Sequence, residues 1–433
     1  MASTTRLKPA EIDALVQQAV FGATDADKTK ARRQIMEAAY GQGIILASIQ
    51  GLYEAAGKGL YKSKTVPAIN IRGITYRVAR AVFRAAMKRR VGAFIFEIAR
   101  SEMGYTDQKP SEYVAAVLAA AIREGFRGFV FIQADHTQVS ASKFKTEPDK
   151  ELGAIKDLIR DAIAAGFFNI DIDASTIVDL SKPTLEEQQE KNCLVTAQMT
   201  EFIRQNEPKG VTVSVGGEIG EVGRRNSTVA DLRAFMGGYR ARLAKGVKGI
   251  SKISVQTGTT HGGVVLPDGS IARVELDFDT LEQLSKLARD EYGMGGAVQH
   301  GASTLPESAF SLFPQRGTLE VHLATGFQNM IFDSAEFPKD LLQKVYAHLA
   351  VASAAERTDG ESDEQFYYKT RKRAWGPFKK ETWSLPEATW QPIADALEAQ
   401  FGMLMEKLGV VDTVDLVQKY VPTASKFELP PAK

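Results

Sequence analysis

Side chains suited to acid–base and metal chemistry stand directly after several apolar segments of this chain. The pair Asp135-His136 follows a run of four apolar residues at 129–132, and two more of the five histidines, His261 and His300, occupy similar positions. An apolar run that ends in such a pair indicates a buried strand whose end opens into a loop carrying polar chemistry. Glycine follows both His261 and His300 directly, as expected where a strand gives way to a turn.

The elements that must position these residues alternate in type along the chain. Strand-like segments are separated by helical patterns, which favours a parallel sheet. Eight such units suit a closed (β/α)8 TIM barrel of the α/β class better than an open doubly wound sheet. No Gly-x-Gly-x-x-Gly opens a helix after the first strand, which weakens a dinucleotide-binding interpretation. The eight predicted strands are 66–70, 94–97, 128–132, 168–173, 211–215, 251–256, 296–299 and 328–332.

Helical patterns flank this alternation on both sides. We therefore predict an N-terminal helical extension over residues 1–60, a barrel over 61–345 and a C-terminal helical extension over 346–433. The stretch 366–375 mixes aromatic and basic residues, and we expect it to pack over the barrel or on a partner subunit rather than on nucleic acid. Within it, Arg371 or Arg373 is a candidate to reach a substrate phosphate.

Composition narrows the class of protein. The 433 residues carry 54 basic and 53 acidic side chains, a net charge of +1 that favours neither nucleic acid nor an anionic membrane. No stretch approaches the roughly 20 apolar residues of a membrane span. The lone cysteine, Cys193, excludes an internal disulfide framework and suits a reducing cytoplasm.

If the barrel forms, the polar residues at its strand ends converge. The carboxyl ends of all barrel strands meet at one face, where active sites of this fold lie. Three histidines and a carboxylate at that face suit a divalent transition metal, first of all zinc, with a position left open for substrate. The strand-end residues are Asn70, Glu97, Asp135, His136, Asp173, Glu218, His261, His300 and Asp333.

Each of these residues also has an ordinary structural role open to it. A single histidine at a strand end is commonly just hydrogen-bonded. Glu218 could be a solvated loop carboxylate, and Asp173 could cap the following helix. Glu97 could form an ion pair with Arg100.

Four motifs together resemble the class II, metal-dependent ketose-bisphosphate aldolases. They are Asp135-His136, Glu218-Ile219-Gly220, Gly258-Thr259-Thr260-His261-Gly262 and His300-Gly301-Ala302-Ser303, and they occur in the family's order between about residues 66 and 333. One departure is Gln133, which stands where the family often has histidine.

The resemblance implies a role for each matching residue. Asp135 would transfer the proton of the substrate hydroxyl, and zinc would be bound by three histidines and Glu218, as a ligand or alternate ligand. Asp173 would lie near a second position for a divalent or monovalent cation. The implied zinc-binding histidines are His136, His261 and His300, and the implied substrate and phosphate contacts are Asn70, Gly262, Gly301, Ser303 and Asp333.

The implied activity is reversible aldol cleavage of a ketose phosphate such as fructose 1,6-bisphosphate to triose phosphates, a lyase reaction of glycolysis and carbohydrate metabolism. Zinc would polarise the ketose carbonyl, so no lysine Schiff base is predicted. The expected form is a cytoplasmic homodimer or larger homo-oligomer whose partner is a phosphorylated sugar, with no nucleic acid and no membrane.

A second resemblance supports an alternative function. The sequence Phe96-Glu97-Ile98-Ala99 and the stretch 172–175 are similar to the accessory subunit of tagatose-bisphosphate aldolase. That similarity implies a non-catalytic barrel subunit that stabilises a partner aldolase.

Overall fold

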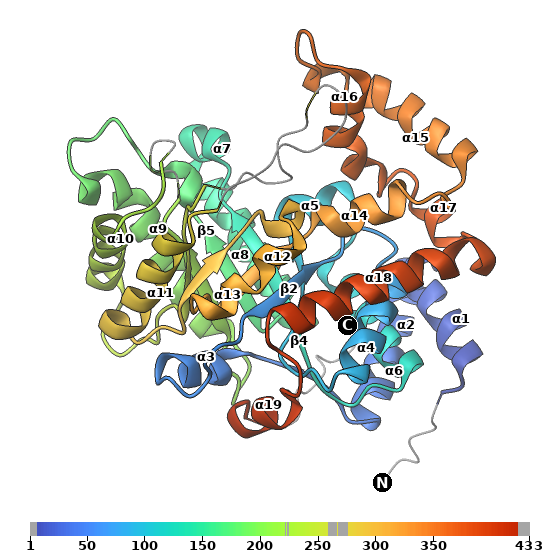
Figure 1. The fold of residues 1–433 in the computed structure, drawn as a ribbon, viewed down its shortest axis with the longest axis horizontal. Coiled ribbons are helices and arrows are strands. Elements are labelled where there is room, and N and C mark those ends of the chain that lie inside the picture. The colour runs from blue at the N-terminus through green and yellow to red at the C-terminus, as the bar shows by residue number, and fades with distance from the viewer. Residues whose placement is uncertain (1–6, 221, 223–224, 259–265, 267–275, 423–433) are drawn as a thin grey trace.

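The parallel barrel predicted from the sequence is confirmed. The computed structural model describes residues 7–220, 222, 225–258, 266 and 276–422 (Figure 1). Its strands follow the order β1-β4-β3-β2-β9-β8-β7-β6-β5, and an additional β4–β5 pairing closes eight of them into a ring. Every pairing between these strands is parallel. The strands are β1 (Ile44–Ala47), β2 (Val66–Asn70), β3 (Ile95–Ala99), β4 (Gly128–Gln138), β5 (Asn169–Asp173), β6 (Ser214–Glu218), β7 (Lys252–Ser254), β8 (Ala297–Gln299) and β9 (Glu320–Leu323).

Helices connect the strands and cover the outside of the barrel, as Figure 1 shows. They include α3 (Gln50–Gly57), α4 (Thr75–Lys88), α5 (Arg100–Tyr105), α6 (Pro110–Glu124), α7 (Ala141–Thr146), α8 (Pro148–Ala165), α9 (Leu185–Asn206), α10 (Val229–Arg242), α11 (Phe278–Tyr292), α12 (Glu307–Phe310), α13 (Leu312–Gln315) and α14 (Thr325–Phe332). Short 3₁₀ turns lie at Ser175–Ile177 (η1), Ala302–Thr304 (η2), Ala354–Glu356 (η3) and Arg371–Ala374 (η4).

Local sequence fixes where several helices begin. Thr184 and Glu187 form a capping box at the start of α9, and Thr228 and Asp231 form another at the start of α10. In each, the threonine hydroxyl accepts a backbone N–H that the helix itself leaves without a partner. At the other end of α8, Gly166 has a φ of +106°, a conformation that favours glycine.

The prediction of the last strand was wrong. Residues 328–332 belong to helix α14, and the eighth barrel strand is β9, which pairs with β2 and β8. The fifth predicted strand was also displaced, because β6 covers 214–218 rather than 211–215. Both shifts matter for the site, since they place Glu218 at the end of β6 and His322 within β9.

The N-terminal part is not wholly helical, although the sequence predicts a helical extension over residues 1–60. It contains α1 (Pro9–Phe21) and α2 (Asp25–Gly41), followed by strand β1. The apolar run Ile44–Ala47 forms this strand by pairing with the first half of β4, outside the ring of eight. The domain boundaries at residues 60 and 345 stay predictions.

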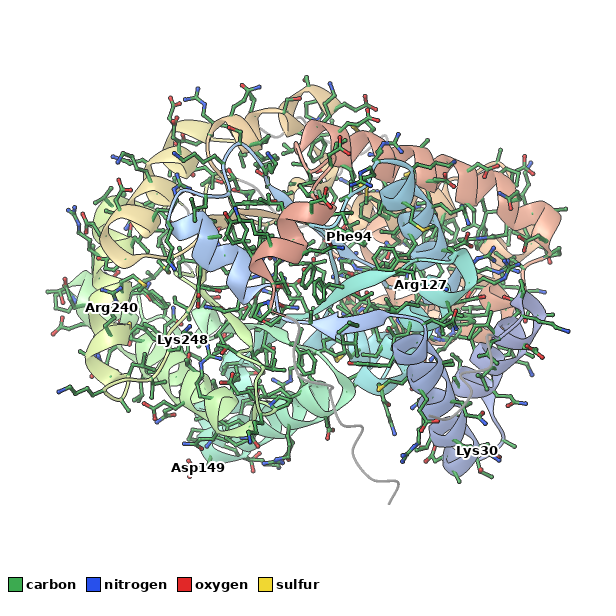
Figure 2. The ribbon with its side chains drawn as sticks, turned by 90° about the horizontal axis from the view of Figure 1, so that it is seen from below. Lys30, Phe94, Arg127, Asp149, Arg240 and Lys248 are labelled. Carbon is green, nitrogen blue, oxygen red and sulfur yellow. The ribbon has the colours of Figure 1, made fainter. Side chains whose placement is uncertain are left out.

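The C-terminal part consists of α15 (Lys339–Ala352), α16 (Asp363–Thr370), α17 (Lys379–Trp383), α18 (Glu387–Lys407) and α19 (Val414–Tyr420). Helix α18 packs along α4, and the ion pair between Glu398 and Arg84 joins the two helices. Charged side chains such as Lys30, Asp149 and Arg240 lie on the outer helices, whereas Phe94 is buried (Figure 2). In the part of the chain that the structure describes, no helix is long and apolar enough to cross a membrane.

Candidate active site

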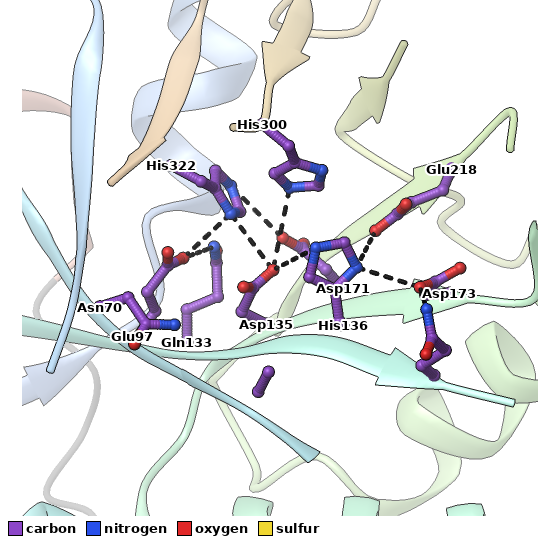
Figure 3. A network of polar contacts seen from close by, with 12 residues as sticks. Asn70, Glu97, Gln133, Asp135, His136, Asp171, Asp173, Glu218, His300 and His322 are labelled. Carbon is purple, nitrogen blue, oxygen red and sulfur yellow. Dashed lines mark hydrogen bonds and ion pairs between the residues drawn. The ribbon is translucent and has the colours of Figure 1, made fainter. Parts of the chain in front are cut away.

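The strand ends bring most of the predicted site residues to one mouth of the barrel. Asn70 ends β2, Asp173 ends β5, Glu218 ends β6 and His300 directly follows β8. A cavity of about 230 Å³ lies at this mouth (Figure 3 shows the polar cluster beside it). The predicted residues that line it are Asn70, Asp135, His136, His300, Gly301 and Ser303.

A distortion in β4 turns both members of the Asp135-His136 pair into this cavity. Successive side chains of a regular strand point to opposite faces. Here the β4–β5 register shifts between Ala134 and Thr137, and His136 has a φ of +41°. A bulge of this kind re-aims side chains, and left-handed backbone at a residue other than glycine is characteristic of functional sites.

Three imidazole rings face one carboxylate oxygen of Asp135. Asp135 Oδ1 lies 3.7 Å from His136 Nε2, 3.8 Å from His300 Nε2 and 3.2 Å from His322 Nδ1. The ligand atoms of Asp135, His136 and His300 all lie within 4.8 Å of one another. Imidazole nitrogens with a carboxylate oxygen are a donor set that zinc accepts, so these residues fit a metal ion.

The predicted ligands Glu218 and Asp173 contact the other nitrogen of His136. His136 Nδ1 lies 2.9 Å from Glu218 Oε1 and 3.0 Å from Asp173 Oδ2. Carboxylates in that position fix the tautomer and orientation of a metal-binding histidine, leaving Nε2 for the metal. Since His136, Asp173 and Glu218 also form a compact group of possible ligands, the predicted second cation position has a matching set of residues here.

His322 is the site residue that sequence reasoning missed. It lies on β9, lines the cavity and is only 5% exposed. Its Nδ1 is 3.2 Å from both Asp135 Oδ1 and Glu97 Oε2 (Figure 3). Its Nε2 is 2.6 Å from Glu320 Oε1. His322 therefore connects the candidate proton-transfer residue to the barrel interior.

A buried ionic cluster supports His322 from below. The Lys252 ammonium donates to Glu320 Oε1 at 2.5 Å, to Gln133 Oε1 at 2.7 Å and to Asp171 Oδ2 at 2.9 Å. Gln133 Nε2 in turn donates to Glu97 at 3.1 Å and to Glu320 at 3.0 Å. Gln133 therefore belongs to the support of the site, and Lys252 is held as a cation rather than as a free amine nucleophile.

Burial and neighbouring charges set the protonation of the carboxyl groups differently. Burial favours the neutral form of Asp135, but the imidazoles of His136, His322 and His300 outweigh it and hold its pKa well below the usual range. Burial raises the pKa of Glu97 well above its usual range, and Asp135 adds to the effect. Burial raises the pKa of Glu218 to about 7, with Asp173 adding and His136 opposing. Asp135 is thus ionised and ready to accept a proton.

The structure decides two of the alternative roles considered from the sequence, an ion pair for Glu97 and a cap for Asp173. Glu97 does not pair with Arg100, because Arg100 binds Glu151 at 2.5 Å while Glu97 faces His322. Asp173 does cap the next turn, since its Oδ1 accepts the backbone N–H of Ser175 at 3.1 Å, while its other oxygen faces His136.

Some predicted residues are not brought to the cavity. Asp333 forms an ion pair with Arg371, and its side chain is 59% exposed at the end of α14. Asp333 followed the strand misplaced at 328–332, which explains the difference. His261 and Gly262 lie outside the described residues, so their roles stay predictions.

Comparison with known protein families gives one match to this chain. Residues 48–373 match the model of the family described as fructose-bisphosphate aldolase class-II. A search of curated proteins finds no match to the sequence.

Several solved structures are similar to this chain at low sequence identity. Fructuronate-tagaturonate epimerase UxaE from Cohnella laeviribosi has a TM-score of 0.59 at 14% identity, over 87% of this chain and 86% of that chain. A probable tagatose 6 phosphate kinase from Sinorhizobium meliloti 1021 has a TM-score of 0.56 at 16% identity, over 82% of this chain and 99% of that chain. Fructose-bisphosphate aldolase from Campylobacter jejuni has a TM-score of 0.49 at 17% identity, over 86% and 96% of the two chains.

Proposed function

This chain belongs to the class II fructose-bisphosphate aldolase family, and on that basis we propose that it is a zinc-dependent lyase that cleaves and forms a carbon–carbon bond of a ketose phosphate. The observation that carries the proposal is the convergence of Asp135, His136 and His300, whose ligand atoms lie within 4.8 Å of one another in one cavity. Fructose 1,6-bisphosphate is the first substrate to test, and the proposed setting is a cytoplasmic homo-oligomer.

The residues divide into metal-binding and proton-transfer groups. His136 and His300 would hold zinc through their Nε2 atoms, with the predicted ligand His261 and with Glu218 as a further candidate. A bound zinc ion would act as a Lewis acid on the substrate carbonyl. Asp173 and Glu218 orient His136 through its Nδ1.

Asp135 is the proposed proton acceptor for cleavage. It takes the hydroxyl proton of the departing aldehyde and returns that proton in the condensation direction. His322 holds Asp135 from one side, and the Lys252–Glu320 pair holds His322, so the carboxylate is fixed before substrate binds. Asn70, Gly301 and Ser303 line the same cavity as candidate substrate contacts.

The test is a substrate screen with a matched variant. Wild-type protein and Asp135→Asn are loaded with zinc and assayed for aldehyde or triose phosphate release from ketose mono- and bisphosphates. Hexuronates belong in the panel because the similar epimerase acts on fructuronate and tagaturonate by its name. We expect the wild type to cleave at least one ketose phosphate and Asp135→Asn to lose about 10²- to 10⁴-fold in rate while keeping its metal.

The alternative, a non-catalytic barrel that stabilises a partner aldolase, predicts a different result in the same screen. Such a subunit would bind little or no zinc and would cleave none of the substrates. That pair of results would refute the enzyme proposal.

A further inference from the structure

The segment that follows α16 is docked firmly on the rim of the cavity. Trp375 is buried, its Nε1 donates to Gln328 Oε1 at 3.1 Å, and its ring centroid lies 4.5 Å from that of Phe332. Two glycines permit this close approach. A Cβ on Gly73 would lie 2.3 Å from the Trp375 ring, and a Cβ on Gly376 would lie 2.4 Å from the Tyr105 carbonyl oxygen. The backbone of this segment is therefore fixed beside the loop that follows β2.

Three consecutive basic residues of the segment have different surroundings. Arg371 binds Asp333 and also donates to Asn329 Oδ1 at 2.6 Å. Arg373 Nε lies 2.7 Å from Glu356 Oε1 and lines no part of the cavity. Lys372, between them, is half-buried and does line the cavity, and no ion pair or hydrogen bond joins its ammonium to any residue that the structure describes. The sequence hypothesis that Arg371 or Arg373 reaches the substrate thus gives way to Lys372.

A second cation, Arg72, lines the same cavity from the loop that follows β2. Arg72 Nε donates to Glu102 Oε1 at 2.7 Å, and its Nη1 donates to Thr325 Oγ1 at 3.2 Å. The other oxygen of Glu102 is occupied, since it accepts from Asn70 Nδ2 at 2.6 Å and from the Ala99 backbone at 2.8 Å.

The side chains of Arg72, Glu102 and Lys372 on this side of the cavity carry two positive charges and one negative charge. Glu102 offsets Arg72, and nothing in the described structure offsets Lys372 to the same degree. Burial lowers the pKa of Lys372, and the nearby Arg72 lowers it further, with Glu102 opposing. An anion placed between the two cations would relieve this repulsion, which is the electrostatic signature of a ready anion site.

We propose that Lys372 and Arg72, with the hydroxyls of Thr325 and Ser303, bind an anionic group of the substrate, either a phosphate or a carboxylate. An arginine fork and a lysine ammonium together supply the donors that such a group needs. Ser303 Oγ already accepts the Ala324 N–H at 2.7 Å, so its own hydrogen is available to donate to the anion. The C-terminal segment, through Lys372, is therefore a specificity-determining part of the cavity that selects anionic over neutral sugars.

This inference rests on the proposed function for the identity of the substrate, but its test measures binding. Inorganic phosphate is titrated by calorimetry into zinc-loaded wild type, Lys372→Ala, Lys372→Arg and Arg373→Ala. We expect wild type and Arg373→Ala to bind alike, Lys372→Ala to bind about 10-fold or more weakly, and Lys372→Arg to recover part of the affinity. Arg373 is the matched control because it is an exposed basic neighbour paired with Glu356.

A second titration distinguishes the two sources of the anion. The same proteins are titrated with a ketose monophosphate and with a hexuronate, and whichever ligand loses affinity in Lys372→Ala carries the recognised group. Equal affinities of wild type and Lys372→Ala for phosphate, ketose phosphate and hexuronate would overturn the proposal, as would an equal loss in Arg373→Ala. A failure of the aldolase proposal would instead appear as absent cleavage with these binding differences intact.

Discussion

His322 offers the sharpest test of how Asp135 is positioned, because its two ring nitrogens contact different partners. Nε2 faces Glu320 at 2.6 Å, and Nδ1 faces Asp135 at 3.2 Å. Glutamine at this position places its amide near the former Nε2, so it can still donate to Glu320. Asparagine places its amide near the former Nδ1, so it can still donate to Asp135. The two variants therefore separate the two contacts of one side chain.

The expected magnitude follows from the contact that each variant loses. A hydrogen bond to a charged group contributes about 1.5 to 3 kcal/mol. If the Asp135 contact acts fully at the transition state, His322→Gln should lower kcat by about 10- to 150-fold. His322→Asn should retain more of the rate, although it loses the contact with Glu320.

A change in pH dependence should accompany the loss of rate. His322 is one of the groups that lower the pKa of Asp135, so its replacement by a neutral amide raises that pKa. The active form has Asp135 ionised, and the acid limb of kcat/KM must therefore move to higher pH in both variants.

The assay is steady-state cleavage of the substrate identified in the screen, measured from the lowest pH at which wild type keeps its zinc up to pH 9, with zinc content determined on the same samples. Zinc content should stay at the wild-type level in both variants. The reasoning would be refuted if His322→Gln kept the wild-type kcat and acid limb, or if it lost its zinc, which would make His322 a metal ligand instead.

Three further predictions concern the metal, the barrel interior and the C-terminal helix. His300→Ala should lower the bound zinc at least 10-fold by elemental analysis, and retention of full zinc content would remove His300 from the ligand set. Lys252→Met should destabilise the fold by about 3 to 5 kcal/mol in chemical denaturation, because it leaves two carboxylates buried without their cation, and a loss below about 1 kcal/mol would contradict that role. Burial favours the neutral form of Glu398, but Arg84 and Lys88 outweigh this effect and lower the pKa of its carboxyl group. The ion pairs of Glu398 therefore add to the free energy of unfolding above pH 4.5, the pKa in the unfolded chain, and this stabilisation is lost as the pH falls through the lower pKa of the folded state. Glu398→Gln should therefore cost about 1 kcal/mol near pH 7 and nothing near pH 2 in thermal denaturation at each pH, and a difference that grows on acidification would reverse our assignment.

The barrel could be predicted because the alternation of strands and helices is local information. Apolar runs such as 128–132 ended in polar residues, and the closed ring then forces those residues together. Asp135 and His300 reached the same cavity although 165 residues separate them. The bulge that turns His136 inward was not predictable, since it depends on the pairing of β4 with β5.

Sequence analysis missed strand β9 because the nearby segment 328–332 has a more strand-like apolar run. Residues 328–332 end in three apolar residues and resemble a strand, but they belong to α14, where Ile331 and Phe332 lie on the buried face. In β9 the polar residues Glu320 and His322 alternate with Val321 and Leu323, and all four are buried. Polar and apolar residues alternate with the period of two that indicates a strand. The signal was hard to recognise because a strand buried on both faces is normally apolar throughout, whereas here the inward positions are polar.

The buried ionic cluster around Lys252 could not be predicted from the sequence, because its partners come from distant strands. Lys252 lies on β7 and Gln133 on β4, and Lys252 bonds to Gln133 as well as to carboxylates of β5 and β9 across the barrel. Charge pairing of this kind depends on which strands face one another inside the ring. Gln133, unusual for the resemblance in the sequence, is explained by its bonds to Glu97, Glu320 and Lys252.

The most direct measurement of the central claim is the zinc dependence of ketose phosphate cleavage by the wild-type protein. The enzyme is stripped with a chelator, dialysed free of it, and assayed for triose phosphate release before and after one equivalent of zinc is restored. We predict that cleavage is lost on stripping and recovers with zinc. Cleavage that persists at the original rate in the metal-free protein, or that never occurs with any ketose phosphate after zinc is restored, would contradict the account.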